Sequence, residues 1–171
     1  MLYLKCTMEV QKVVGLRKSD LTEAEASKTL LGNWYVHRFP IGRTHFFLFM
    51  NEVSLLSFVL YQGKKPVTPK TLPGMFLMGL NQLLAMKGYQ PSVIDQVMLG
   101  YRDGLFSKPD SRKVLGCMND LVSLYTAMVE APGGIHQCDL TGIIMRLNAM
   151  PQRTLDCGTS WDAVTKLLRS S

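Results

Sequence analysis

Two runs of aromatic and apolar residues, separated by a short turn, constrain the fold of this chain more than any other feature. They lie in residues 31–52, LGNWYVHRFPIGRTHFFLFMNE. Aromatic and β-branched residues favour strands, and the Pro-x-Gly sequence between the runs favours a tight turn. The pattern predicts a β-hairpin that turns at Ile41–Gly42, which would place Arg38 opposite His45.

Apolar side chains occupy both faces of this expected hairpin near its strand ends, whereas polar and cationic side chains gather near its turn. A hairpin with one face in water would alternate apolar and polar residues. We therefore expect both faces to be covered, by helices on one side and by a loop, a helix or a second subunit on the other. Arg38, Arg43 and His45 would then lie at an exposed rim.

The remaining strands and helices are predicted from shorter patterns. Strands are expected at 2–5 and 54–61, and helices at 8–14 and, from the capping-box sequence TEAE, at 23–30. In the second half of the chain, apolar residues recur every three or four positions between capping residues and terminating Gly or Pro. The helices expected there span 75–87, 92–105, 139–150 and 160–168, together with a long helix that begins at Asp110 or Ser111 and ends at 130.

These elements together predict an α+β fold. We expect a small, mostly antiparallel sheet of about four strands in the N-terminal third, packed with about five or six helices. The Pro-, Gly- and Lys-rich segment 62–74 divides a strand-rich part, 1–62, from a helical part, 75–171. A chain of 171 residues is nonetheless expected to form a single domain over 1–171.

Basic residues exceed acidic residues by 19 to 13, which gives a net charge of +6. The excess is concentrated between Trp34 and Gly88, where six basic residues accompany a single acid, Glu52. A basic surface of this kind suits phosphate groups or an acidic protein, although a solvated face that only maintains solubility has the same composition. The candidate binding residues are Arg38, Arg43, His45, Lys64, Lys65, Lys70, Arg112 and Lys113.

The helix expected at 111–130 begins with an unusual charge pattern. Arg112 and Lys113 occupy its first turn, where the helix dipole favours acids. A bound anion or the local carboxylates of Asp110 and Asp103 would offset this cost, and the carboxylates are the simpler explanation. Further along the helix, the Asn119–Asp120 pair interrupts an apolar stretch and is expected to bind backbone groups of a neighbouring segment.

No set of residues has the spacing of a metal or catalytic site. His136 and Cys138 are close in sequence, but a structural zinc site would need a second such pair. Cys117 lies in the middle of a helix, where a buried thiol is the ordinary outcome, and nearness in sequence does not make a triad of His136, Cys138 and Asp139. We expect no metal, no cofactor and no catalytic residue.

The cysteines indicate a cellular compartment. They are far apart and form no C-x-x-C pair, which favours free thiols in a reducing, cytoplasmic setting. The opening sequence MLYLKCTMEV lacks the pattern of a signal peptide, and no apolar run approaches the roughly 20 residues of a membrane span. We therefore expect a cytoplasmic protein without a membrane partner.

Four segments in order along the chain carry a resemblance to a known family. They are LKCTMEVQKVVGL, LGNWYVHRFPIGRTHFFLFMNEVSLLSFVL, SRKVLGCMNDLV and LNAMPQRTL with the following WDAVTKLL. The chain resembles a family from bacteria and mobile elements that is catalogued only as a domain of unknown function. Where that family has a more basic run of the R-R-K type, this chain has GRTH. The resemblance implies one full-length domain and a bacterial or phage source, and it implies no activity.

The sequence favours a non-enzymatic binding or regulatory protein that engages nucleic acid or an acidic protein through its basic hairpin and loop. One alternative is a small enzyme, of nuclease or transferase type, that uses His37, His45 or His136 together with Arg112 and Asp120. The other alternative is a homo-oligomer in which the aromatic hairpin forms the interface.

Overall fold

The aromatic-rich segment forms the predicted hairpin. The computed structural model describes residues 1–170, in which β2 (Trp34–Ile41) and β3 (Thr44–Asn51) are antiparallel. The predicted register is wrong by two residues, because the turn lies at Gly42–Arg43 rather than at Ile41–Gly42. Gly42 has a φ of 60°, the left-handed conformation that a two-residue hairpin turn requires at its first position.

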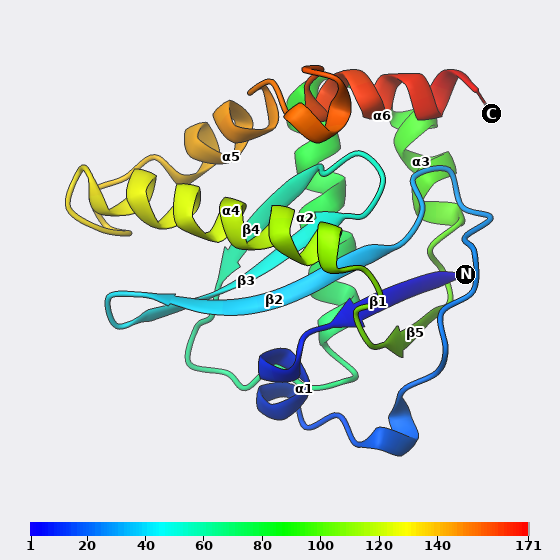
Figure 1. Cartoon of the computed structure of the whole chain (residues 1–171), viewed down its shortest axis with the longest axis horizontal. Coiled ribbons are helices and arrows are strands. Elements are labelled where there is room, and N and C mark those ends of the chain that lie inside the picture. The colour runs from blue at the N-terminus through cyan, green and yellow to red at the C-terminus, as the bar shows by residue number, and fades with distance from the viewer. Residues whose placement is uncertain (171) are drawn as a thin grey trace.

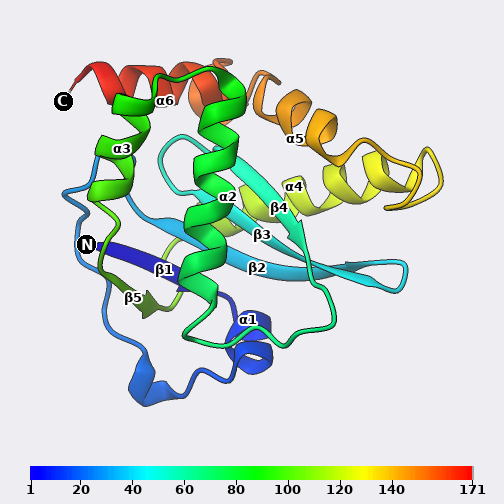
Figure 2. The same ribbon diagram turned by 180° about the vertical axis from the view of Figure 1, so that it is seen from behind.

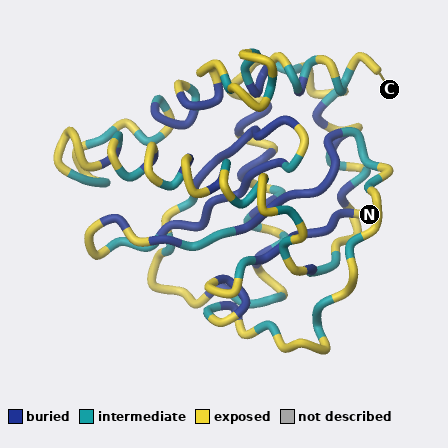
Figure 3. Tube along the Cα trace, in the orientation of Figure 1, coloured by how far each residue is buried: buried dark blue, intermediate teal, exposed yellow. Residues whose placement is uncertain are grey.

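The shift in register changes the pairing partners but not the faces of the sheet. Arg38 lies opposite Phe47, and His45 lies opposite Pro40. Because side chains alternate with a period of two, a shift by two residues keeps each one on its predicted face. Both faces are covered, as predicted, and Figure 3 shows buried stretches along β2 and β3 and an exposed turn.

The sheet has the strand order β4–β3–β2–β1–β5. At one edge, β4 (Ser57–Tyr61) pairs antiparallel with β3. β1 (Leu2–Cys6) lies between β2 and β5 (Gly104–Ser107) and runs parallel to both. The α+β class, with an N-terminal sheet packed with helices, is confirmed. β5 is an addition to the prediction, which placed its first residues at the end of a helix.

Within the described residues, six α-helices surround the sheet: α1 (Met8–Val14), α2 (Leu72–Lys87), α3 (Pro91–Leu99), α4 (Arg112–Glu130), α5 (Leu140–Asn148) and α6 (Ser160–Arg169). α2 covers one face of the sheet and α4 covers the other, while α5 packs along the outer edge of β4 (Figures 1 and 2). None of these helices, in the part of the chain that is described, is long and apolar enough to cross a lipid bilayer.

The helix predicted at 23–30 is wrong. Residues 22–33 form neither helix nor strand and bend at 29–31, and the Thr22 N–H donates to the carbonyl of Phe106 in β5. The Asn33 side chain donates to the carbonyl of Glu25 at 3.2 Å. These long-range bonds satisfy the backbone that a short helix would otherwise have satisfied internally, so tertiary contacts override the local capping signal.

Two of the predicted helix starts are confirmed by side-chain caps, whereas α2 begins at Leu72 rather than at 75 and α3 begins at Pro91 without a side-chain cap. The Ser111 hydroxyl accepts from the Val114 N–H at the start of α4, and the Asp139 carboxylate accepts from the Gly142 N–H at the start of α5. α6 occupies the expected range, but its cap is Thr159, which forms a capping box with Asp162, rather than Ser160.

An aromatic cluster fills the space between the sheet and α2. The ring of Trp34 lies 5.0 Å from that of Phe76 in α2, and the rings of Phe49 and Phe58 lie 5.0 Å apart. The Trp34 indole N–H donates to the Tyr101 hydroxyl at 3.0 Å, so the polar atom of this fully buried ring is satisfied. These rings are therefore core, as the alternation of the hairpin predicts.

A buried asparagine shapes the turn that leads from β3 to β4. The Asn51 side chain is fully buried; its Nδ2 donates to the Leu31 carbonyl at 2.8 Å, and its Oδ1 accepts from the Ser54 N–H at 2.8 Å. These bonds hold a tight turn in which Leu55 has a φ of 59°. Asn51 therefore has a structural role.

Candidate anion-binding cavity

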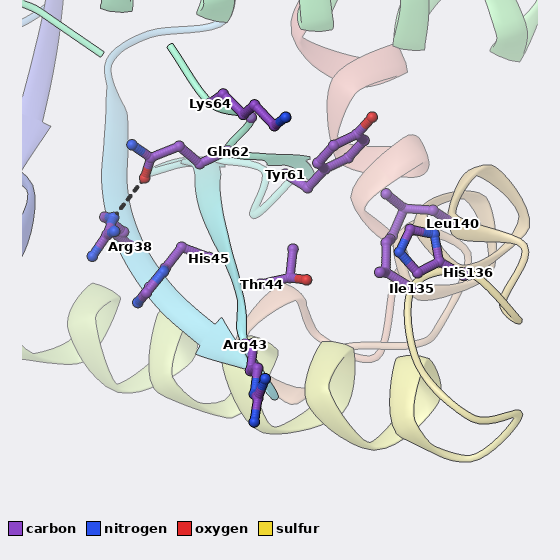
Figure 4. Close-up of a pocket in the computed structure, with 11 residues that line it drawn as sticks. Arg38, Arg43, Thr44, His45, Tyr61, Gln62, Lys64, Ile135, His136 and Leu140 are labelled. Atoms are coloured by element: carbon purple, nitrogen blue, oxygen red, sulfur yellow. Dashed lines mark hydrogen bonds between the residues drawn. The ribbon is translucent and has the colours of Figure 1, made fainter. Parts of the chain in front are cut away.

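A cavity of about 730 Å³ opens at the turn end of the β2–β3 hairpin. Its walls come from the hairpin turn, from the end of β4 with the loop that follows, and from the loop between α4 and α5. Its basic side chains are those of Arg38, Arg43, His45, Lys64 and His136. In Figure 4, Arg38 and His45 lie on one side, His136 lies on the other, and Arg43 and Lys64 lie at the two ends. We call this the basic cavity.

Arg38 forms part of the wall rather than a free cation. Its Nε donates to Gln62 Oε1 at 2.9 Å, and its Nη1 lies 3.2 Å from Glu9 Oε1. The Arg38 side chain is only 14% exposed, so these partners hold the guanidinium in place. A ligand in the basic cavity would meet a positive group whose charge is already partly balanced.

Arg43 and Lys64 are the exposed cations of the cavity. Within the described part of the chain, neither side chain forms an ion pair. Arg43 is carried by the hairpin turn and Lys64 by the loop after β4, so they are far apart in sequence. An anion that bound to either of them would gain charge-assisted hydrogen bonds without first breaking an internal salt bridge.

The rest of the lining combines hydroxyl groups with apolar surface. Thr44 and Tyr61 contribute hydroxyls, and Ile135 and Leu140 contribute aliphatic side chains. Among the described residues, no aspartate or glutamate lines the basic cavity. Asp139, which precedes Leu140, is directed to the N-terminus of α5 as its cap. The cavity can therefore accept a negatively charged group that carries an apolar neighbour.

The other predicted binding residues lie elsewhere. Lys65 is exposed in the loop after β4, next to the cavity but outside its lining. Lys70 lines a separate hollow with Arg17 and Asp20. Lys113 lines another, with acids and Arg153, and Arg112 is exposed at the start of α4. The structure thus assembles the hairpin part of the predicted basic face and separates the rest.

The residues of the enzyme alternative do not converge. His45 and His136 both line the basic cavity, but His37 lies outside its lining, with Nδ1 2.9 Å from Thr7 Oγ1. Burial lowers the pKa of His37, although the nearby Glu9 acts in the opposite direction. Asp120 and Arg112 lie on α4, away from both histidines of the cavity.

Two expectations for α4 need correction. Asn119 and Asp120 are exposed rather than bound to a neighbouring segment, because the apolar face of α4 is directed toward the sheet and this pair lies on the opposite side. Asp110 forms no ion pair with Arg112 or Lys113 in the described structure. Its carboxylate is bound by Lys5, at 2.9 Å, and by the Tyr35 hydroxyl, at 2.8 Å. Solvent screens Arg112 instead.

The partners of Asp110 belong to a part-buried charge network that the sequence patterns did not reveal. The Lys5 ammonium, with a side chain only 6% exposed, contacts Glu52 at 2.6 Å and Asp110 at 2.9 Å. Burial alone would lower the pKa of Lys5, but the hydrogen bonds to Asp110 and Glu52 outweigh it, and the pKa is raised. The network joins β1 to the turn after β3 and to the start of α4, and we assign it a structural role.

One sequence signal points to this network in retrospect. Lys5 interrupts the apolar strand LYLKC, and a lysine is almost never buried in a sheet without an acidic partner. Glu52 was the single acid in a basic region, and its role as that partner explains its presence. Asp110 could not have been assigned, because it lies 105 residues away from Lys5.

Comparison with known proteins identifies a family but no activity. No curated protein matches the chain. A family model described as a domain of unknown function, DUF6933, matches residues 3–163. The match includes the hairpin, the basic cavity and the charge network. The chain therefore belongs to this family of domains of unknown function.

Proposed function

We propose that this chain is a non-enzymatic binding protein that engages an anionic partner, an acidic protein or nucleic acid, through the basic cavity. The observation that carries the proposal is the pair of exposed cations, Arg43 and Lys64, at the two ends of a cavity without an acidic lining residue. A carboxylate or phosphate fits this charge distribution.

The aromatic hairpin is not the binding surface in this proposal. Trp34, Phe47 and Phe49 are fully buried beneath the helices of the same chain, so their rings are unavailable for stacking on bases or for pairing with a second copy. Only the turn and the neighbouring loop contribute to binding. The free state of the four cysteines fits the proposed cytoplasmic setting, and the proposed source is a bacterium or a phage.

The test is binding of fluorescent probes, measured by anisotropy. The probes are a dT20 oligonucleotide and a peptide of ten glutamates, each at low and at moderate salt. The charge-reversal variant is Arg43→Glu/Lys64→Glu, and its control is Lys18→Glu/Lys28→Glu, which makes the same change in net charge at exposed residues outside the basic cavity. We expect the first variant to weaken binding by about tenfold or more and the control by much less.

The salt dependence gives an independent check. Raising the salt from about 0.05 to 0.3 M should weaken binding in the unmodified chain and should have a smaller effect in Arg43→Glu/Lys64→Glu, because fewer ionic contacts are then left to screen. Equal loss in the two charge-reversal variants would mean that only overall charge matters. That result, or binding of neither probe, would overturn the proposal.

A further inference from the structure

We infer that the partner is a protein segment in which apolar residues adjoin acidic residues, and that its apolar part lies in a groove beside the basic cavity. This inference rests on the proposed function, because it assigns the acidic part of the segment to the basic cavity. It adds a second contact surface and selects one class of partner.

The groove lies between two helices and has a strand as its floor. α2 and α5 form its walls and β4 forms its base, with a cavity volume of about 340 Å³. Met75, Met78 and Met86 line the α2 side, and Ile144 lines the α5 side. Met78 and Met86 are 56% and 48% exposed, so apolar surface is open to solvent here. Methionine side chains are flexible and adapt to varied apolar partners.

The groove continues into the basic cavity. Tyr61 at the end of β4 and Leu140 at the start of α5 line both hollows. Within the described residues, no charged side chain lines the groove, and no acidic side chain lines the cavity. A ligand that spans the two must therefore change along its length from apolar to anionic.

The exposed edge of β4 favours a peptide as this ligand. The Gln62 N–H donates to the His45 carbonyl, so the alternation of an antiparallel ladder turns the peptide groups of Ser57, Val59 and Tyr61 away from β3. Asn148 occupies this edge at Ser57: its Oδ1 accepts from the Ser57 N–H at 2.9 Å, and its Nδ2 donates to the Ser57 carbonyl at 2.7 Å.

The edge is closed at one end and open at the other. Val59 is only 2% exposed, whereas Tyr61 is 60% exposed and lies at the junction of the groove and the cavity. An extended segment can therefore bond to the main chain at Tyr61, with its apolar residues in the groove and its acidic residues in the cavity.

The charge distribution separates this partner from nucleic acid. A single strand of nucleic acid carries a phosphate at every nucleotide, so it needs cations along the whole contact. Among the described residues, the groove offers no cation to such a strand. A nucleic acid would contact the basic cavity alone and would leave the methionines of α2 exposed.

The experiment is selection from a random library of 12-residue peptides displayed on phage, with the whole chain immobilised. The most enriched peptide is synthesised, labelled and titrated by anisotropy. The groove variant is Met78→Gln/Met86→Gln, which removes apolar contacts without changing the charge. Its control is Met8→Gln/Met150→Gln, since both residues are exposed and line neither hollow. The variant Arg43→Glu/Lys64→Glu tests the basic cavity.

We expect the enriched peptides to contain apolar residues next to aspartate or glutamate. The groove variant and the charge variant should each lower the affinity for the selected peptide about tenfold, and the methionine control should bind it with unchanged affinity. The groove variant should bind dT20 as tightly as the unmodified chain does.

Each other outcome overturns the inference. Suppose that Arg43→Glu/Lys64→Glu weakens the binding of dT20 or polyglutamate, while Met78→Gln/Met86→Gln binds the selected peptide normally. The proposed function is then supported and the inference is refuted. The inference is also refuted, and the proposed function kept, if the library enriches no acidic–apolar sequences while Arg43→Glu/Lys64→Glu still weakens the binding of dT20. Displacement of the peptide by palmitate alone, or a dimer by light scattering that the groove variant abolishes, would assign the groove to a fatty acid or to a second copy. If the charge variant affects no probe, both proposals fall.

Discussion

Gly79 in α2 should be replaceable by alanine only at a cost, although alanine is the better helix former. A Cβ atom built at Gly79 would lie 2.3 Å from Cε2 and 2.9 Å from Cδ2 of the Phe58 ring. That ring is 2% exposed and stacks on Phe49 with centroids 5.0 Å apart, so it cannot move aside freely. The close approach of α2 to β4 at this glycine also shapes the floor of the groove.

Two opposing effects set the size of the change. Alanine gains about 1 kcal/mol over glycine inside a helix, while forcing a methyl group into a packed core typically costs about 1–3 kcal/mol. Because the overlap is with a buried aromatic ring rather than with a flexible chain end, we expect the cost to lie in the upper part of that range, at about 2–3 kcal/mol, and to exceed the gain. The free energy of unfolding should therefore fall by about 1–2 kcal/mol in Gly79→Ala.

The matched control is Gly116→Ala in α4. A Cβ atom at Gly116 would have no heavy atom within 4 Å, so only the helix-propensity gain applies. We expect this variant to be more stable by about 0.5–1 kcal/mol. Urea unfolding followed by circular dichroism measures both changes. If Gly79→Ala were as stable as the unmodified chain, or more stable, the packing of α2 on Phe58 would be looser than described.

Two further predictions concern buried polar groups. Asn148→Ala should lower the free energy of unfolding, measured by urea titration, by about 2–4 kcal/mol, because it leaves the buried N–H and C=O of Ser57 without partners. The control Asn119→Ala, on the exposed side of α4, should change the free energy of unfolding by less than about 0.5 kcal/mol. Burial lowers the pKa of His37 in the folded chain, so at mildly acidic pH the unfolded chain binds a proton at this residue more readily. The contribution of the neutral His37 side chain to stability is therefore full above the ordinary pKa of 6.5. That contribution is lost as the pH falls from 6.5 toward the folded-state pKa. Thermal melts between pH 7.5 and 5.5 should show a smaller loss of stability for His37→Asn than for the unmodified chain, and parallel profiles would contradict the assignment of this titration to His37.

The parts of the fold that depend on local signals were predictable. The caps of α4 and α5 and the faces of the hairpin follow from side-chain chemistry within a few residues or from a strict period of two. Predicting the register depends on which two residues form the turn. Because the Pro-x-Gly sequence at Pro40 favours a turn, the prediction placed the turn one residue too early. β5 was missed because it has four residues and pairs with β1, whose sequence lies about a hundred positions earlier.

The candidate site was predictable to the same extent. The hairpin and the following loop were expected to present cations, and Arg43, His45 and Lys64 do line one cavity. His136 joins them through the long connection between α4 and α5, which carries no pattern that relates it to the hairpin. The apolar groove could not be foreseen either. The spacing of Met75, Met78 and Met86 predicts one helix face, but whether that face is buried depends on the position of α5.

The polar residues of this chain fall into two groups that differ in whether their bonds are already made. The buried polar groups of Asn51, Asn148 and Lys5 have partners within the chain, so each serves the fold and is costly to remove. Arg43 and Lys64 have no acidic partner in the described structure, yet they lie beside a cavity and next to exposed apolar surface. Exposed charges without partners contribute little to stability, so losing them should leave unfolding unchanged and should affect only association. Substitutions in the first group should therefore lower stability, and substitutions in the second should lower binding at constant stability; a variant of the second group that unfolds more readily would assign the basic cavity to the fold instead of to a partner.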